Sequence, residues 1–153
     1  MNFARFLHLL GQALWIGGGI AAMTLALAAR SEDGTVKAGV YRLLARVHGV
    51  VIAPGALITV LSGLWLTMGM ARRGQGAELG EPGLATMQAA GIIAGMLVLF
   101  VALPTANLLA RVAEPDQNGQ RRPVFEKLRK RQAVVSSVAG ALAVLALVAA
   151  RLL

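Results

Sequence analysis

The stretch that decides the fold is FARFLHLLGQALWIGGGIAAMTLALAA, residues 3–29, in which Arg5 is the one charged side chain. An α-helix needs about 20 mainly apolar residues to cross the ~30 Å hydrocarbon layer of a bilayer. Three further apolar runs of at least that length follow, at residues 43–70, 84–110 and 133–153. The sequence therefore predicts an all-α integral membrane protein with four membrane-spanning helices.

Composition supports the same fold class. Hydrophobic residues make up 57% of the chain and charged residues 14%, and the mean hydropathy of +0.68 lies outside the range of soluble domains. The four spans leave only short loops, so residues 1–153 are expected to form a single four-helix bundle with up-down antiparallel topology. The first span is too long for a signal peptide and no cleavage pattern follows it, so we expect it in the mature protein.

The basic residues indicate how the bundle lies in the membrane. The net charge is +8, but these residues flank the spans, which favours a membrane over nucleic acid as the partner. Eleven lie in or beside loops 30–42 and 111–131, against four on the other side. The positive-inside rule then predicts a bacterial inner-membrane protein with these two loops in the cytoplasm and both termini in the periplasm. The eleven are Arg30, Lys37, Arg42, Arg46, Arg111, Arg121, Arg122, Lys127, Arg129, Lys130 and Arg131, and the four are Arg5, Arg72, Arg73 and Arg151.

Within the third loop, residues 121–131 combine basic side chains with a short apolar face of Val124, Phe125 and Leu128. Such a segment is typical of an amphipathic stretch lying on the anionic inner leaflet. The same composition also suits a solvated basic linker, so both interpretations stay open.

Few side chains in the spans can carry chemistry. His8 and Gln12 are four residues apart and therefore share one helix face, His48 lies six residues before Pro54, and Gln88 opens the third span. No acidic residue lies in any span, which argues against a carboxylate proton relay. A neutral imidazole in lipid suits a ligand of haem iron or copper, or else a hydrogen-bonded packing residue.

Depth limits how the two histidines can act. His8 lies about five residues from one membrane face and His48 about six from the other, so at ~1.5 Å per residue their depths differ by more than ~10 Å. A single haem iron therefore cannot easily be bound by both histidines. Two haems, one haem on a single histidine, or a haem shared between His8 of two subunits of a dimer remain possible. The methionines at the level of His8 would suit Cu(I), or a His/Met haem, and these are Met68, Met70 and Met87.

The first two spans resemble a known group. Leu7–Gly11 and Leu14–Gly18, followed by Pro54 and Leu61–Leu66, are similar to small bacterial four-helix membrane proteins. This group includes the HemJ-type protoporphyrinogen IX oxidases, the copper-resistance D membrane proteins and uncharacterised relatives. The resemblance implies that His8 matches the histidine tied to haem in HemJ-type members. The third span has Gln88 where those enzymes carry a basic residue, which argues against the oxidase activity.

Together these observations predict a membrane protein that binds haem b through His8, with Gln12 beside it, and that takes part in electron transfer or haem-related redox chemistry. Further candidate cofactor ligands are His48 and Gln88. The alternatives are a copper-handling membrane protein that uses His8 and the three methionines, and a cofactor-free structural subunit of a larger membrane complex. The bundle is expected to form a homodimer or to join such a complex.

Overall fold

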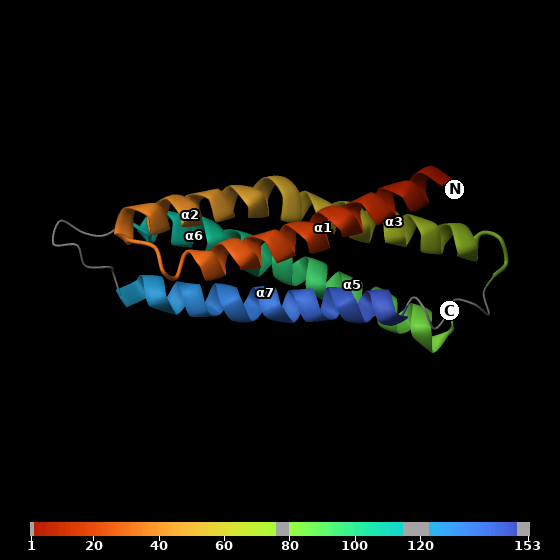
Figure 1. Cartoon of the computed structure of the whole chain (residues 1–153). Helices are drawn as coiled ribbons and strands as arrows, with labels where there is room; N and C mark the ends of the chain where they lie inside the picture. The colour runs from red at the N-terminus through yellow and green to blue at the C-terminus, as the bar shows by residue number, and fades with distance from the viewer. Residues whose placement is uncertain (1, 76–79, 115–122, 150–153) are drawn as a thin grey trace.

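The computed structural model describes residues 2–75, 80–114 and 123–149, and every regular element in this part of the chain is a helix. The elements run antiparallel along one elongated bundle (Figure 1). Four helices in the described residues are long and apolar enough to cross a membrane, which confirms the predicted fold class. The elements are α1 (Asn2–Ala28), α2 (Gly34–Val47), η1 (His48–Ile52), α3 (Ala53–Ala71), α5 (Pro82–Leu97), η2 (Val98–Ala102), α6 (Leu103–Val112) and α7 (Pro123–Ala149).

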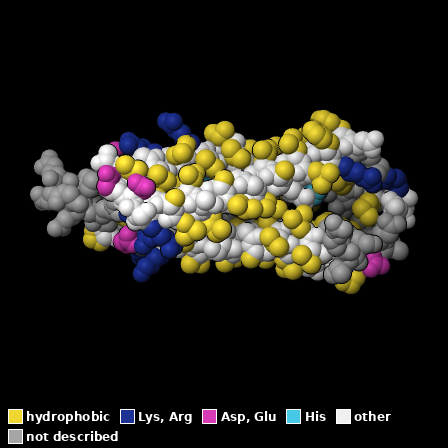
Figure 2. All heavy atoms as spheres, in the orientation of Figure 1, with side chains coloured by type: hydrophobic (Ala, Val, Ile, Leu, Met, Phe, Trp, Pro, Cys, Tyr) yellow, Lys and Arg dark blue, Asp and Glu magenta, His cyan; other side chains and the backbone are white. Residues whose placement is uncertain are grey.

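The bundle has two distinct ends. The end where α1 begins and α7 ends is here called the termini end, and the end where α2 and α7 begin is called the basic end. Figure 2 shows yellow apolar side chains over the middle of the molecule and most of the dark blue Lys and Arg side chains at the basic end. Large side chains such as Val50 and Phe100 are about three-quarters exposed in that apolar zone. This is the surface that a helix bundle presents to lipid.

The second long helix begins nine residues before the predicted span, at Gly34 rather than residue 43. Asp33 starts it, because its side chain accepts a hydrogen bond of 2.9 Å from the backbone N–H of Val36. Ala38 and Tyr41 are buried on the added turns. The hydropathy pattern missed these turns because their other face is polar and basic.

The fourth long helix begins ten residues before the predicted span, at Pro123. Phe125 is fully buried, and its ring meets Tyr41 edge to face with centroids 5.1 Å apart. In the described part of residues 121–131 the buried Phe125 fits neither an apolar face lying on the leaflet nor a solvated linker. Residues 123–131 are the first turns of α7, docked on α2 by the aromatic pair. Residues 114–119, whose sequence EPDQNG is typical of a turn, lie almost wholly outside the described residues.

Two wide turns interrupt the second and third long helices. η1 and η2 are π-helical turns, in which Ala53 donates its N–H to the His48 carbonyl and Leu103 donates to the Val98 carbonyl. Each wide turn is followed by a proline, Pro54 or Pro104. A proline lacks the N–H and crowds the preceding turn, and a π-turn relieves that crowding.

Packing differs between the two ends of the bundle. Near the termini end, α1 lies directly on α3 because both helices carry glycine at the crossing. A Cβ on Gly11 would lie 2.6 Å from Thr59 Oγ1, and one on Gly55 would lie 2.7 Å from the Trp15 backbone nitrogen. Towards the basic end α2 packs on α6, whereas α1 and α7 barely touch each other. The gap between α1 and α7 forms the groove described below.

Candidate functional site

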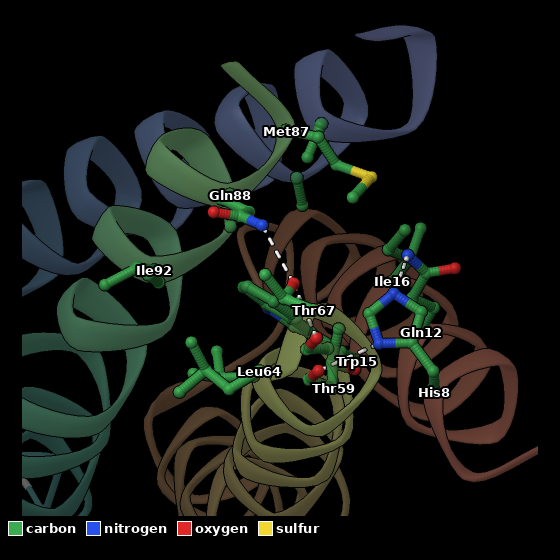
Figure 3. A pocket seen from close by; sticks show the side chains of 15 residues that line it. His8, Gln12, Trp15, Ile16, Thr59, Leu64, Thr67, Met87, Gln88 and Ile92 are labelled. Atoms are coloured by element: carbon green, nitrogen blue, oxygen red, sulfur yellow. Dashed lines mark hydrogen bonds between the residues drawn. The ribbon is translucent and has the colours of Figure 1, made fainter. Parts of the chain in front are cut away.

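His8 lies on α1 and turns its ring onto α3 (Figure 3). Its Nδ1 is 2.9 Å from the Thr59 carbonyl oxygen and 3.2 Å from Ser62 Oγ. A carbonyl oxygen can only accept, so Nδ1 carries the proton, and Nε2 accepts from the Gln12 amide nitrogen at 3.3 Å. The ring fits there because Gly63 has no side chain, and a Cβ on Gly63 would lie 3.1 Å from His8 Cε1.

The cavity beside His8 is small, and its lining is mostly apolar with a few polar side chains. Its volume is about 60 Å³, and its lining includes four of the predicted site residues, which are His8, Gln12, Met87 and Gln88. The amide of Gln88 donates to Thr67 Oγ1 at 2.8 Å and so joins α5 to α3. A water molecule needs ~10–15 Å³ of such space, so the cavity has room for only a few waters.

The methionines predicted as soft donors do not gather at His8. Of the three, Met87 alone lines the His8 cavity, while Met68 is about half exposed and Met70 lies outside the lining. Together with His8 the structure supplies two donors for a copper ion at this point. Among the described residues no group of three or more His, Cys, Asp and Glu side chains could hold a metal ion.

His48 has the same arrangement in the other half of the bundle. Its side chain is 6% exposed, and its Nδ1 is 2.9 Å from the Leu44 carbonyl oxygen. Its Nε2 therefore accepts, at 3.0 Å, from the amide nitrogen of Gln132 on α7. The same amide nitrogen lies 3.3 Å from Ser136 Oγ, and the amide oxygen of Gln132 is buried without a hydrogen-bond partner.

Gln132 is the site residue that the sequence analysis missed. It stands immediately before the predicted fourth span at residue 133, in a run of basic residues, and so was not counted among the polar groups within lipid. A signal was available in principle, because Gln132 and Ser136 are four residues apart and share one helix face. Its partner His48 is 84 residues away in sequence, so only packing could reveal the pair.

His48 and Gln132 line a groove between α1 and α7, and the groove has a volume of about 730 Å³. Its floor is formed by the two π-turns, which contribute His48, Ile52, Val98 and Ala102. Its walls include many small side chains, among them Gly19, Ala22 and Ala26 of α1 and Gly140 and Ala143 of α7. A volume of this size lies within the ~300–1,000 Å³ typical of small-molecule and cofactor sites.

The two histidines face different cavities. His8 is absent from the lining of the groove, and His48 is absent from the lining of the His8 cavity. Trp15, Ile16 and Ala143 line both and form the wall between them. This separation agrees with the predicted difference in depth.

Comparison with known proteins places the chain in a family. A family model described as a predicted integral membrane protein, DUF2269, matches residues 2–153. The chain belongs to the DUF2269 family. No curated protein and no solved structure matches it. The description of the DUF2269 family as a predicted integral membrane protein agrees with the four apolar helices of this chain.

Proposed function

We propose that this DUF2269 protein binds haem b in the groove, where His48 would hold the iron, and takes part in electron transfer or haem-related redox chemistry. The observation that carries the proposal is the buried His48 imidazole on the floor of a large apolar groove. Its Nδ1 is held by the Leu44 carbonyl, which is how metal-ligating histidines are commonly oriented.

The residues around His48 fit a haem. Nε2 holds its lone pair towards the Gln132 amide, so rotation of that one side chain would free the ligating nitrogen. The same rotation would also move the Gln132 amide oxygen out of its present position, where it is buried without a hydrogen-bond partner. Bound haem supplies an iron centre that exchanges single electrons. The chain would orient it through His48 and exclude water with the small apolar walls of the groove.

Volume favours His48 over His8. The two imidazoles have equivalent hydrogen bonds, from Nδ1 to a backbone carbonyl and from a glutamine amide to Nε2. The His8 cavity of about 60 Å³ cannot take a porphyrin, whereas the groove has about twelve times that volume. The resemblance to HemJ-type proteins points to His8, and haem at that position would require α1 and α3 to separate or a second subunit to add room.

The charge distribution supports an orientation for the site. The positive-inside rule favours an orientation with the basic end in the cytoplasm of a bacterial inner membrane and both termini in the periplasm. His48 would then lie in the cytoplasmic half of the bundle and His8 in the periplasmic half. An electron partner for a haem at His48 would approach from the cytoplasmic side or within the inner leaflet.

The test is reconstitution with haemin of the purified chain and of His8→Ala and His48→Ala variants in detergent. We expect a Soret band in the parent and in His8→Ala, and its loss or a clear change of ligation state in His48→Ala. Circular dichroism and size-exclusion chromatography check that each variant is folded. A parent without a Soret band, or a His48→Ala variant with the parent's spectrum, would contradict the proposal.

A further inference from the structure

Three basic side chains line the groove at the basic end. Arg30 follows the last turn of α1, and Arg129 and Lys130 lie on the first turns of α7, so cations stand on both sides of the gap. We refer to Arg30, Arg129 and Lys130 as the basic rim. The rest of the lining contains no acidic residue, so the groove is an apolar slot with positive charge at one end.

The charge of the rim is only partly neutralised. Arg129 forms an ion pair of 2.6 Å with Glu126, one turn earlier on α7. In the described part of the chain neither the Arg30 guanidinium nor the Lys130 ammonium forms an ion pair. Lys37 adds a further positive charge nearby, because its ammonium donates to the Arg30 carbonyl oxygen at 3.0 Å. The rim thus keeps net positive charge that no side chain in the described residues balances.

The groove opens sideways, towards lipid. Ile20, Met23 and Val144 line it and are also more than half exposed. A Cβ built on Gly19 or on Gly140 would meet nothing within 4 Å, so the gap between α1 and α7 is not closed by close packing. A ligand with an apolar body can therefore reach the groove from the bilayer without crossing water.

We propose that the basic rim selects an amphiphile with anionic groups and orients it, with the acid end at Arg30 and Lys130 and the apolar body along the groove. This inference rests on the proposed function in taking the groove as the ligand site, but it does not depend on iron. The two carboxylates of haem meet the requirement, and so does an anionic phospholipid of the bilayer. The apolar walls favour the body of the ligand, and the rim discriminates by charge.

The experiment uses iron-free protoporphyrin IX, a diacid, and its dimethyl ester, which has the same ring without the charges. Binding is followed by quenching of Trp15 fluorescence in a Trp65→Phe background, because Trp15 lines the groove and Trp65 is two-thirds exposed outside it. The rim variant is Arg30→Gln with Lys130→Gln. The matched control is Arg46→Gln with Arg131→Gln, which removes two exposed basic residues near the same end that do not line the groove.

We expect the diacid to bind the parent and the control with similar affinity and the rim variant about 25-fold more weakly, at about fivefold for each charge removed. The dimethyl ester should bind all three proteins weakly and alike. If the rim variant and the control lose affinity for the diacid equally, the binding reflects only general attraction by the charge of the basic end, and the inference is wrong. Equal affinity of the parent for the diacid and the ester would also overturn the inference.

A lipid arm distinguishes the two sources of anionic groups. The same titrations are made in nanodiscs of phosphatidylcholine and of phosphatidylcholine with phosphatidylglycerol. If phosphatidylglycerol displaces the diacid from the parent but not from the rim variant, the rim is supported with a phospholipid as its occupant. If it does not compete, the porphyrin diacid is the supported occupant. Competition that is equal in the parent and the rim variant would contradict recognition by the rim.

The outcome is separable from that of the haem test. If the haem spectrum depends on His48 but diacid affinity is the same in the parent and the rim variant, the proposed function is supported and this inference is contradicted. If diacid affinity falls in the rim variant but the haemin spectrum is unchanged in His48→Ala, this inference is supported and iron ligation by His48 is contradicted.

Discussion

The two halves of the bundle contain nearly the same histidine and differ in the space around it. At the termini end His8 is hydrogen-bonded by the Thr59 carbonyl and the Gln12 amide, and at the basic end His48 is hydrogen-bonded by the Leu44 carbonyl and the Gln132 amide. The first stands beside a cavity of about 60 Å³ and the second on the floor of a groove of about 730 Å³. A hydrogen-bonded histidine can therefore form part of a ligand site only where the helices around it leave enough volume for the ligand.

The cause of the difference lies in the backbone. Gly11 and Gly55 let α1 and α3 come into contact at the termini end and so close the space beside His8. At the other histidine, α1 and α7 are not drawn together, and two π-turns shape the floor between them. Glycine thus has opposite roles in the two halves. Gly11 packs directly against α3 and leaves no room for a side chain, whereas Gly140 faces open space.

The largest expected effect is at the tight contact. Gly11→Ala would place a methyl group 2.6 Å from Thr59 Oγ1 and less than 3 Å from two backbone atoms of α3, so the two helices must move apart. We expect a loss of about 2–3 kcal/mol in the free energy of unfolding, as for overpacked cores. Thermal or SDS-induced unfolding in detergent, followed by circular dichroism, measures it.

The matched control is Gly17→Ala on the same helix, where a Cβ would meet nothing within 4 Å. Its effect should stay within ~0.5 kcal/mol, as is usual for exposed positions. If the two variants unfold alike, the close approach of α1 and α3 is not what distinguishes the two halves.

A substitution at the open glycine should affect binding and not stability. Gly140→Leu projects into the groove from α7, where a Cβ meets no neighbour, so the fold should keep its stability within ~0.5 kcal/mol. The ligand would then be crowded, and we expect haemin affinity to fall about tenfold, corresponding to a cost at the low end of overpacking. Haemin titration followed at the Soret band checks this.

Val138→Leu serves as the control for Gly140→Leu, because Val138 is exposed on the same helix and does not line the groove. Affinity unchanged in Gly140→Leu would mean that the ligand does not occupy the groove beside α7.

The smallest effect concerns the polar contacts of the His8 half. Thr67→Val removes the hydroxyl that accepts from the Gln88 amide and so breaks the link between α3 and α5. Such interhelical hydrogen bonds in membrane proteins contribute ~0.6 kcal/mol on average, and we expect a loss of that size in the free energy of unfolding. A double-mutant cycle with Gln88→Leu isolates the pair, and a coupling energy of zero would show that the contact does not hold this half together.

Much of the architecture could be predicted from particular residues. The apolar runs predicted four spans, and the spacing of His8 and Gln12 predicted that they share a face, where they do make contact. The early starts of α2 and α7 were missed because their first turns are amphipathic. Hydropathy depends on nearby residues only, so it gives no sign that Tyr41 and Phe125 are buried against each other.

The sequence by itself determined the membrane environment, the number of spans and the candidate imidazoles, because transfer from water to hydrocarbon depends on each residue and its near neighbours. Only the tertiary structure decided which histidine has space beside it and which glutamine, 84 residues away, is hydrogen-bonded to it. It also decided that three basic residues, one just after α1 and two on α7, stand at one end of the same groove. These features depend on which pairs of helices touch and which do not. That choice is made by shape complementarity across the whole bundle, which no local pattern records.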